Sequence, residues 1–157
     1  MEARVKAFLT KVEYMVEGET TSDAIARLAS EKGGGLGLSW DAGLDDADCD
    51  VIAYLLHGGA LAQLQTTLNL EDNVITDAGL ATLSQSFSDG ALPQIQLLSM
   101  VISQRFGDEG LTALAQAIGG GALPMLKTLW IDQTHITHPR LMAVCQARNI
   151  ELDHCWQ

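Results

Sequence analysis

Cysteine, long apolar runs and positive charge are all scarce in this sequence, and each scarcity excludes a class of protein. The three cysteines are an odd number, so they do not form the paired framework of a small secreted disulfide protein. No apolar run approaches the roughly 20 residues that span a bilayer. Residues 1–6 alternate charged with apolar side chains, unlike a signal peptide. We therefore expect a soluble protein of the reducing, cytoplasmic compartment.

Basic residues are few: 9 lysines and arginines stand against 20 aspartates and glutamates, for a formal net charge of −11. The imbalance is concentrated after residue 33, where fourteen acids face only four bases. Nucleic-acid affinity rests on cationic neutralisation of phosphates, so we do not expect nucleic-acid binding. Anionic lipid headgroups are disfavoured for the same reason. A protein partner with a basic or neutral surface remains open.

What the sequence does contain is hydrophobic content and an internal repeat. Its 157 residues are 47% hydrophobic and 18% charged, which argues against disorder and suits a single domain over 1–157. The tripeptide Gly-Ala-Leu recurs every 31 residues, at 59–61, 90–92 and 121–123. Such self-similarity indicates a repeat architecture. The predicted units are repeats over 59–89, 90–120 and 121–149, with a degenerate copy over 34–58.

Each repeat combines two hydrophobic periods. A Leu-x-Leu segment alternates with period 2, which predicts a short strand with one buried face. An apolar stripe at helical spacing follows, for example Leu80, Leu83 and Phe87, which predicts an amphipathic helix. Neither element buries its apolar side alone, so stacked repeats must share one core.

Polar residues and glycines mark the predicted helix ends. A side-chain oxygen at the N-cap accepts orphan backbone N–H groups of the first turn. The predicted N-cap residues are Asp46, Asp77 and Asp108, with Thr137 or His138 ahead of Pro139 in the last repeat. Gly90 and the glycines at 119–121 lie just past helix ends, where a left-handed cap suits glycine.

The two ends of the chain depart from the repeat. Residues 1–33 predict a helical N-terminal cap, with a first helix over 3–16 and a second helix capped by Thr21 or Ser22 and stopped by the glycines at 33–35. The apolar stripe of the first helix is Val5, Phe8, Leu9, Val12 and Val16. Residues 150–157 repeat the strand signature without a helix, which predicts a terminal strand cap. Whether the N-terminal helices only cover the core or also bind a partner stays open.

This pattern resembles leucine-rich repeats, in particular the ribonuclease-inhibitor-like class found in NOD-like receptors and Ran GTPase-activating proteins. The resemblance is strong over 59–150 and weak over 34–58. It implies an α/β fold: a right-handed leucine-rich-repeat solenoid with five parallel strands on the concave face, helices on the convex face and helical N-terminal cover. The chain departs from the family in its period of 31 residues, against roughly 20–29. Of the residues at the asparagine position of the repeat, only Asn73 fits, against Asp41, Ser103 and Thr134.

Residues with metal-binding chemistry do not follow a metal-site pattern. The acidic run at 45–50 lacks the glycine and glutamate of a calcium-binding loop and coincides with a predicted helix start, where the helix dipole favours carboxylates. The side chains with zinc-ligand chemistry fall in separate predicted layers: His135, His138, Cys145, His154 and Cys155. Solvated or hydrogen-bonded histidines are favoured over a zinc site. We predict no metal and no cofactor.

Nucleophiles and phosphate loops give no stronger signal. Cys49 aligns with the apolar stripe of the later repeats, which predicts a small buried hydrophobe. The glycines at 119–121 lack the lysine of a P-loop and precede a strand rather than a helix. No serine, histidine and aspartate have the spacing of a catalytic triad. We predict that the chain is not an enzyme.

Outward-facing side chains on the strands form the predicted binding surface. One residue inside each Leu-x-Leu segment must face away from the core, and parallel strands about 4.8 Å apart align such residues in columns. The predicted columns are Gly37, Asn69, Ser99, Trp130 and Glu151; Ser39, Glu71, Val101, Asp132 and Asp153; and Trp40, Asp72, Ile102, Gln133 and His154. The predicted partner-binding residues among them are Trp40, Asn69, Glu71, Asp72, Ser99, Val101, Trp130, Asp132, Gln133, Glu151 and Asp153. Trp130 among carboxylates resembles an aromatic interface anchor with a polar rim, although structural cover of the sheet is an alternative role for it.

Three functional hypotheses follow. The resemblance implies a protein–protein interaction module, so the first is an intracellular adaptor whose acidic concave strip receives a basic or neutral partner segment on Trp130. The alternative is an accessory structural subunit of a larger complex that docks through its N-terminal cap or convex helices. A regulator of a small GTPase is less favoured, because only the shared scaffold supports it.

Overall fold

The computed structural model describes residues 1–30, 38–39, 42–101 and 105–154. Six helices and five strands occupy these residues. The helices are α1 (Glu2–Lys11), α2 (Thr21–Ser30), α3 (Asp46–His57), α4 (Asp77–Ser88), α5 (Asp108–Gly119) and α6 (Pro139–Ala147). The strands are β1 (Leu38–Ser39), β2 (Thr67–Asn69), β3 (Leu97–Ser99), β4 (Thr128–Trp130) and β5 (Glu151–Asp153). Residues named above that lie outside the described part of the chain are those at 33–35, Gly37, Trp40, Asp41, Ile102, Ser103 and Cys155.

The five strands form one parallel sheet in which each strand pairs with the next strand along the chain. The register places one leucine of each strand in a single row: Leu38, Leu68, Leu98, Leu129 and Leu152. The leucines of the three central strands are fully buried, so this row faces the core. The predicted α/β fold of alternating helices and parallel strands is confirmed.

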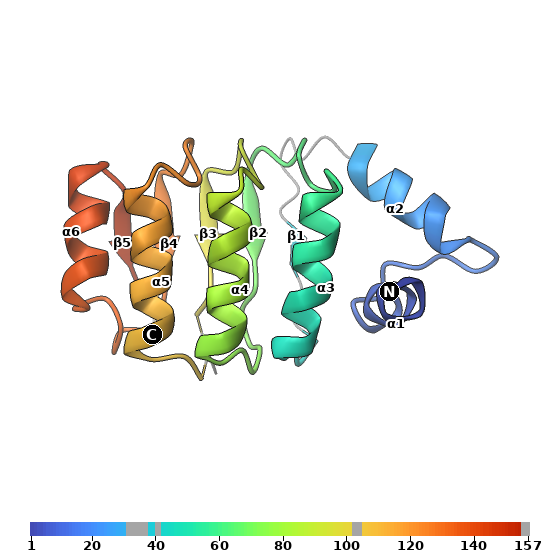
Figure 1. The fold of residues 1–157 in the computed structure, drawn as a ribbon, viewed down its shortest axis with the longest axis horizontal. Coiled ribbons are helices and arrows are strands. Elements are labelled where there is room, and N and C mark those ends of the chain that lie inside the picture. Colours follow the sequence, from blue (N-terminus) through green and yellow to red (C-terminus); the bar gives the residue numbers. More distant parts are fainter. Residues whose placement is uncertain (31–37, 40–41, 102–104, 155–157) are drawn as a thin grey trace.

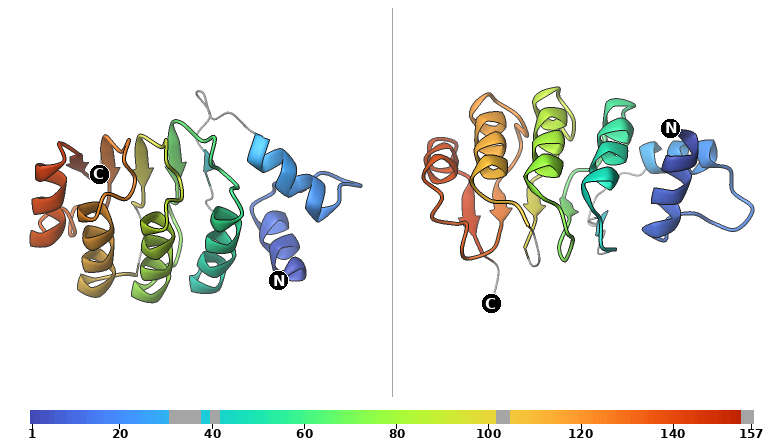
Figure 2. Two further views of the ribbon diagram at one scale, coloured as in Figure 1. Left: turned by 45° about the horizontal axis from the view of Figure 1, so that its top comes forward. Right: turned by 60° about the horizontal axis from the view of Figure 1, so that its bottom comes forward.

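Helices α3 to α6 stand side by side on one face of the sheet, as Figures 1 and 2 show. The part of the chain that the structure describes places no helix on the other face (Figure 2). The core lies between the two layers and includes the predicted stripe Leu80, Leu83 and Phe87, each at most 1% exposed. Because α4 packs between α3 and α5, each stripe is buried by its own strand and by the neighbouring units.

The Gly-Ala-Leu tripeptide forms the turn that ends a helix. Gly59, Gly90 and Gly121 have φ of 85°, 97° and 100°, in the left-handed region that glycine adopts without strain. The following N–H reaches back to a helix carbonyl, as from Ala60 to Leu55 over 3.0 Å, which is the bonding of a Schellman cap. The leucines that come next also have positive φ but are almost fully buried. The free energy gained by burying these side chains offsets the cost of a backbone conformation that is rare for leucine.

A carboxylate at the start of one helix reaches the start of the next helix. Asp77 is the first residue of α4, and its Oδ1 accepts the backbone N–H groups of Gly107 (2.7 Å) and Gly110 (2.8 Å) at the start of α5. Asp46 likewise accepts the backbone N–H of Thr76 over 2.8 Å, together with its hydroxyl group. Each aspartate therefore satisfies orphan donors of a neighbouring helix, at the end where the helix dipole favours negative charge.

This arrangement corrects the predicted N-caps. The three aspartates occupy the first helical position, and the N-cap residues are Asp45, Thr76 and Gly107. In the last unit His138 is the N-cap, one of the two predicted alternatives; its Nδ1 accepts the N–H of Leu141 over 3.3 Å, and its Nε2 lies 2.8 Å from Oδ1 of Asp108. The aspartates thus act on the following unit, which spacing within one helix does not reveal.

The glycine of the repeated Asp-x-Gly motif makes space for this contact. A Cβ added at Gly110 would lie 2.7 Å from Oδ1 of Asp77, closer than real Cβ contacts. A Cβ at Gly79 would meet the Asp46 carboxylate in the same way. The aspartate of one unit and the glycine of the next are therefore two halves of one contact.

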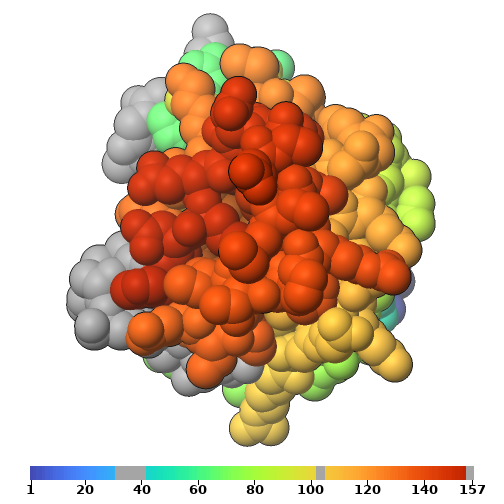
Figure 3. All heavy atoms as spheres, turned by 90° about the vertical axis from the view of Figure 1, so that its left-hand side faces the viewer, coloured from blue at the N-terminus to red at the C-terminus, as the bar shows by residue number. Residues whose placement is uncertain are grey.

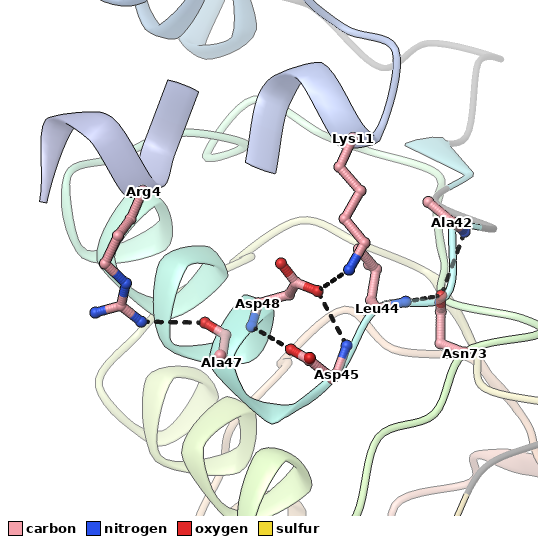
Figure 4. A network of polar contacts seen from close by, with 8 residues as sticks. All are labelled: Arg4, Lys11, Ala42, Leu44, Asp45, Ala47, Asp48 and Asn73. Carbon is pink, nitrogen blue, oxygen red and sulfur yellow. Dashed lines mark hydrogen bonds and ion pairs between the residues drawn. The ribbon is translucent and has the colours of Figure 1, made fainter. Parts of the chain in front are cut away.

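Asn73 makes a further bond between units, in its predicted position. Its side chain is fully buried, Oδ1 accepts the N–H of Leu44 over 2.8 Å, and Nδ2 donates to the carbonyl of Leu70 over 2.9 Å; Figure 4 shows the contact with Leu44. Thr134 at the corresponding position of a later repeat is exposed. The amide contact is thus formed in the first units and is not repeated at Thr134.

Figure 4 also shows the polar contacts that hold α1 against the first repeat. Lys11 Nζ donates to Oδ2 of Asp48 over 2.6 Å, and Arg4 donates to the carbonyl of Ala47 over 3.3 Å. Asp45 and Asp48 form a capping box at the start of α3, each accepting the backbone N–H of the other. The N–H of Asp48 holds the pKa of Asp45 below its usual value. The acidic run at 45–50 therefore begins a helix, as predicted.

The N-terminal helices differ from the prediction at their ends. α1 stops at Lys11 rather than at 16 because Glu13 takes a φ of 56°, which ends the helix. Val16 is consequently 59% exposed instead of joining the buried stripe. Neither residue of the predicted pair 21–22 caps α2; the hydroxyl of Thr20 accepts a backbone N–H of the first turn over 3.1 Å.

An arginine closes the C-terminal unit. Arg148 donates to the carbonyl of Ile118 in the last turn of α5 (2.9 Å) and to the carbonyls of Ala122 and Leu123 (2.7 Å), which follow that helix. A guanidinium there satisfies orphan carbonyls and complements the negative end of the helix dipole. Asn149, with φ of 54°, takes the place that glycine has in the earlier turns. Figure 3 looks onto this end of the molecule, which α6 and its flanking segments cover.

The contact between Asp77 and Gly110 is testable by a double-mutant cycle. We expect Gly110→Ala to lower the free energy of unfolding by about 1–3 kcal/mol, because the new methyl group collides with the carboxylate. Asp77→Ala should cost about 1–2 kcal/mol through the loss of two accepted N–H bonds. In the double variant the collision with Oδ1 is gone. The sum of the losses in the two single variants should therefore exceed the loss of unfolding free energy measured for the double variant.

Urea unfolding followed by circular dichroism measures all three variants. Gly58→Ala is the matched control, because its Cβ would meet only ordinary contacts at 3.5 and 3.7 Å. Strict additivity of the two costs would contradict the proposed contact.

Candidate functional site

The bare face of the sheet carries the predicted partner-binding residues. We call it the strand face and define it by the side chains that alternate with the buried leucine row. Its columns are Thr67, Leu97, Thr128 and Glu151; Asn69, Ser99, Trp130 and Asp153; and Glu71, Val101 and Asp132. The exposed Asp72 and Gln133 follow directly after the third column. Trp40 lies outside the described residues.

The register corrects the ends of the predicted columns by two residues. The sequence placed Glu151 beside Trp130, but the partner of Trp130 in the sheet is Asp153. At the other end of the sheet Ser39 takes the place predicted for Gly37. In both end strands the second leucine of the signature, Leu38 or Leu152, pairs in register with the leucine of the neighbouring strand, which shifts the register of the whole strand by two residues.

Trp130 faces away from the core. The preceding Leu129 is fully buried in the leucine row, so strand alternation directs Trp130 to the strand face. The side chain is half-buried there. Its neighbours in the sheet are Ser99 on β3 and Asp153 on β5. Trp130 therefore combines partial exposure with an adjacent carboxylate.

Two of the predicted partner-binding residues are not available at the surface. Ser99 is 0% exposed and Val101 is 4% exposed, although both face away from the leucine row. The Ser99 hydroxyl donates to Oε1 of Glu71 over 2.8 Å. The serine side chain is also shorter than those of Asn69 and Trp130, its neighbours in the same column. In the structure the Ser99 hydroxyl therefore contacts Glu71 rather than solvent.

Every ionisable side chain that we place on the strand face is acidic. These residues are Glu71, Asp72, Asp132, Glu151 and Asp153. Asp72 and Glu151 are exposed, and the other three are half-buried. Three arginine and lysine residues of the N-terminal helices are instead paired within the cap and with α3, since Arg27 bonds Glu19 over 2.9 Å and Arg4 and Lys11 reach Asp50 and Asp48. The strand face therefore has a negative potential.

The side chains considered as zinc ligands have other surroundings. His135 packs on the ring of Phe106 at a centroid distance of 5.3 Å, His138 caps α6, and Cys145 is buried in the core. Cys155 lies outside the described residues, and His154 follows β5. Within the described ranges no group of three or more histidine, cysteine, aspartate or glutamate side chains has the arrangement of a metal site.

Both described cysteines are buried, as predicted for Cys49. Burial raises the pKa of the Cys145 thiol to about 11. Burial also raises the pKa of Cys49 far above its usual range, reinforced by the negative charge of Asp46 and neighbouring aspartates. A thiol with a raised pKa is not a nucleophile at neutral pH.

A groove that no sequence motif predicted lies on the helix side of the molecule. The groove lies between α5 and α6 and is lined by Ala115, Gly119, Ala143 and Val144, together with Gln116 and Arg140. The two helices approach each other closely at Gly119, where an added Cβ would lie only 3.2 Å from the side chain of Val144. On the same helix Met142 is 47% exposed. Small residues at facing helix positions are the sequence signal that marks it.

Comparison with known proteins identifies no relative: no protein-family model matches the chain, and no curated protein matches it. No described helix is long and apolar enough to cross a membrane.

The buried thiols give a direct test of the core. With iodoacetamide at pH 8 we expect neither Cys49 nor Cys145 to be alkylated in the folded protein, because both are buried and protonated. Unfolding in urea should expose them and return their pKa values to about 8.5, so that labelling becomes rapid. Peptide mass spectrometry identifies the labelled residue.

A Ser88→Cys variant is the positive control, since Ser88 is exposed at the end of α4. The raised thiol pKa values also predict that the contribution of these two thiols to stability is constant below about pH 8.5. That contribution should fall as pH rises toward 11, by up to about 1.4 kcal/mol per pH unit for each thiol. Fast labelling of native Cys145 would contradict its placement in the core.

Proposed function

We propose that the chain is a leucine-rich-repeat solenoid that acts as a protein–protein interaction module and binds a basic or neutral partner segment on its strand face. The observation that carries the proposal is the half-buried Trp130 beside Asp153 on a sheet face that no described helix covers. A tryptophan whose neighbours are polar has the composition of an interface anchor with its rim.

The scaffold beneath Trp130 supports this role. The strand that carries it is paired on both sides, and Leu129 fixes it to the core at 0% exposure. A side chain on a rigid strand loses little conformational freedom when a partner binds. The surrounding carboxylates attract a basic segment and repel an acidic one, so they contribute association rate and specificity.

Replacement of the anchor tests the proposal. We expect Trp130→Ala to weaken partner binding by about 2 kcal/mol or more, because a buried interface aromatic contributes most of the contact energy. Reversal of the charge at Asp132 should instead slow association and reduce its salt dependence. The partner is first captured by pull-down at low and high salt, identified by mass spectrometry, and then titrated by surface plasmon resonance.

Tyr54→Ala is the matched control, since Tyr54 is an aromatic side chain 50% exposed on α3, in the helix layer. It should leave the affinity unchanged. Equal affinities for wild type and Trp130→Ala would refute the anchor role.

A second candidate function is that of an accessory subunit that docks through the convex helices. The groove between α5 and α6 favours it, because its lining is mostly small and apolar, and the apolar side chain of Met142 on α6 is 47% exposed. The N-terminal cap is a weaker docking surface, since its apolar residues Val5, Phe8 and Leu9 are already buried in the chain's own core. A GTPase-regulating role has only the resemblance behind it, and the lack of enzymatic activity stays a prediction.

The variant Ala143→Glu separates the two candidates. Ala143 is exposed on α6, so a glutamate there should not disturb the core but would fill the groove with charge. If the chain docks through its helices, we expect Ala143→Glu to reduce partner binding at least tenfold, about 1.4 kcal/mol, while Trp130→Ala has no effect. The reverse pattern in the same binding assay supports the strand face.

A further inference from the structure

We propose that the strand face recognises arginine, with the guanidinium of a partner arginine stacked on the indole of Trp130 and paired with the carboxylate of Asp153. This inference rests on the proposed function, because it specifies the partner chemistry of the same face. The inference follows from the strand register, which pairs Trp130 with Asp153. The sequence columns had paired Trp130 with Glu151 instead.

The two side chains stand side by side. Trp130 and Asp153 are aligned partners on adjacent parallel strands, whose spacing is about 4.8 Å. Each follows a residue of the leucine row, Leu129 or Leu152, so both point to the strand face. A cation resting on the indole is therefore within reach of the carboxylate.

The Asp153 carboxylate has capacity for a ligand. Oδ1 accepts the backbone N–H of His154 over 2.7 Å. Across the described part of the chain no lysine or arginine forms an ion pair with Asp153. An ionised carboxylate has about four acceptor positions, so most of its capacity is open to a donor from outside.

Charge complementarity points to a cation. Glu151 lies two residues before Asp153 on the same strand and is exposed, and Asp132 lies two residues after Trp130, just beyond the end of β4. Together with Asp153, these carboxylates make the potential near Trp130 negative, which attracts a cation and repels an anion.

The flat indole beside a carboxylate selects arginine over lysine. A guanidinium is planar, stacks on an aromatic face and presents paired donors that match a carboxylate. It is also more weakly hydrated than an ammonium group, so stacking removes less hydration. A lysine at the same place gains the charge attraction but not the planar stacking or the paired hydrogen bonds.

Three peptides of equal length test the selectivity: (Gly-Arg)₄, (Gly-Lys)₄ and (Gly-citrulline)₄, where citrulline keeps the planar shape of arginine without its charge. Isothermal titration or NMR titration at low salt measures each dissociation constant. We expect the arginine peptide to bind about three- to tenfold more tightly than the lysine peptide. The citrulline peptide should bind more weakly than both, because the carboxylates then have no charge to attract.

Variants assign the preference to the two residues. Trp130→Ala should reduce the arginine-over-lysine preference to less than about twofold, and Trp130→Phe should keep part of it, because a phenyl ring still offers a stacking face. Asp153→Asn should weaken both cationic peptides and keep their order. Tyr54→Ala serves as the control for loss of an exposed aromatic, and circular dichroism verifies that each variant is folded.

The outcomes separate this inference from the proposed function. Equal binding of the arginine and lysine peptides, or a preference that survives Trp130→Ala, overturns the arginine inference. No binding of either cationic peptide overturns it as well. The proposed function then still stands if Trp130→Ala loses the captured partner, and fails if that partner binds the variant unchanged.

Discussion

The structure depends on one constraint: no single unit of this chain is able to bury its own apolar faces. Each helix stripe meets its own strand on one side and the neighbouring helices on the other, so the core exists only where units stack. The aspartates at helix starts follow the same logic, because the carboxylate of Asp77 satisfies backbone donors of the next helix, whose Gly110 leaves space for it. The burial of apolar side chains and the hydrogen bonding of polar backbone groups therefore both depend on contacts between units.

This constraint decides which surfaces are free. The helix layer occupies one face of the sheet, α1 and its ion pairs cover the first unit, and Arg148 and α6 close the last. Carboxylates accordingly divide into two groups. Those at helix starts, such as Asp45 and Asp77, are engaged in capping, whereas those on the strand face, such as Glu151 and Asp153, lie at the surface near Trp130. The acidic residues thus include one group that caps helices and a second group that lies on the strand face.

The proposed binding role and the arginine preference share a physical basis. A parallel sheet fixed by a fully buried leucine row holds its outward side chains at regular spacing, so the face is ordered before a partner arrives. An aromatic ring next to a carboxylate on such a face discriminates among cations by shape as well as by charge. The groove between α5 and α6 lacks that combination and suits apolar contact instead.

The sequence by itself determined the repeat, the order of helices and strands, the Gly-Ala-Leu turns and the buried leucines, because each of these leaves a periodic signal within a few residues. It also placed Trp130 on an outward strand position. Only the tertiary structure decided that Asp153 rather than Glu151 stands beside Trp130, that Ser99 and Val101 are covered, and that Asp77 caps a helix one unit away. These features join residues more than twenty positions apart, and the register that joins them is set by packing between units, which local periodicity does not record.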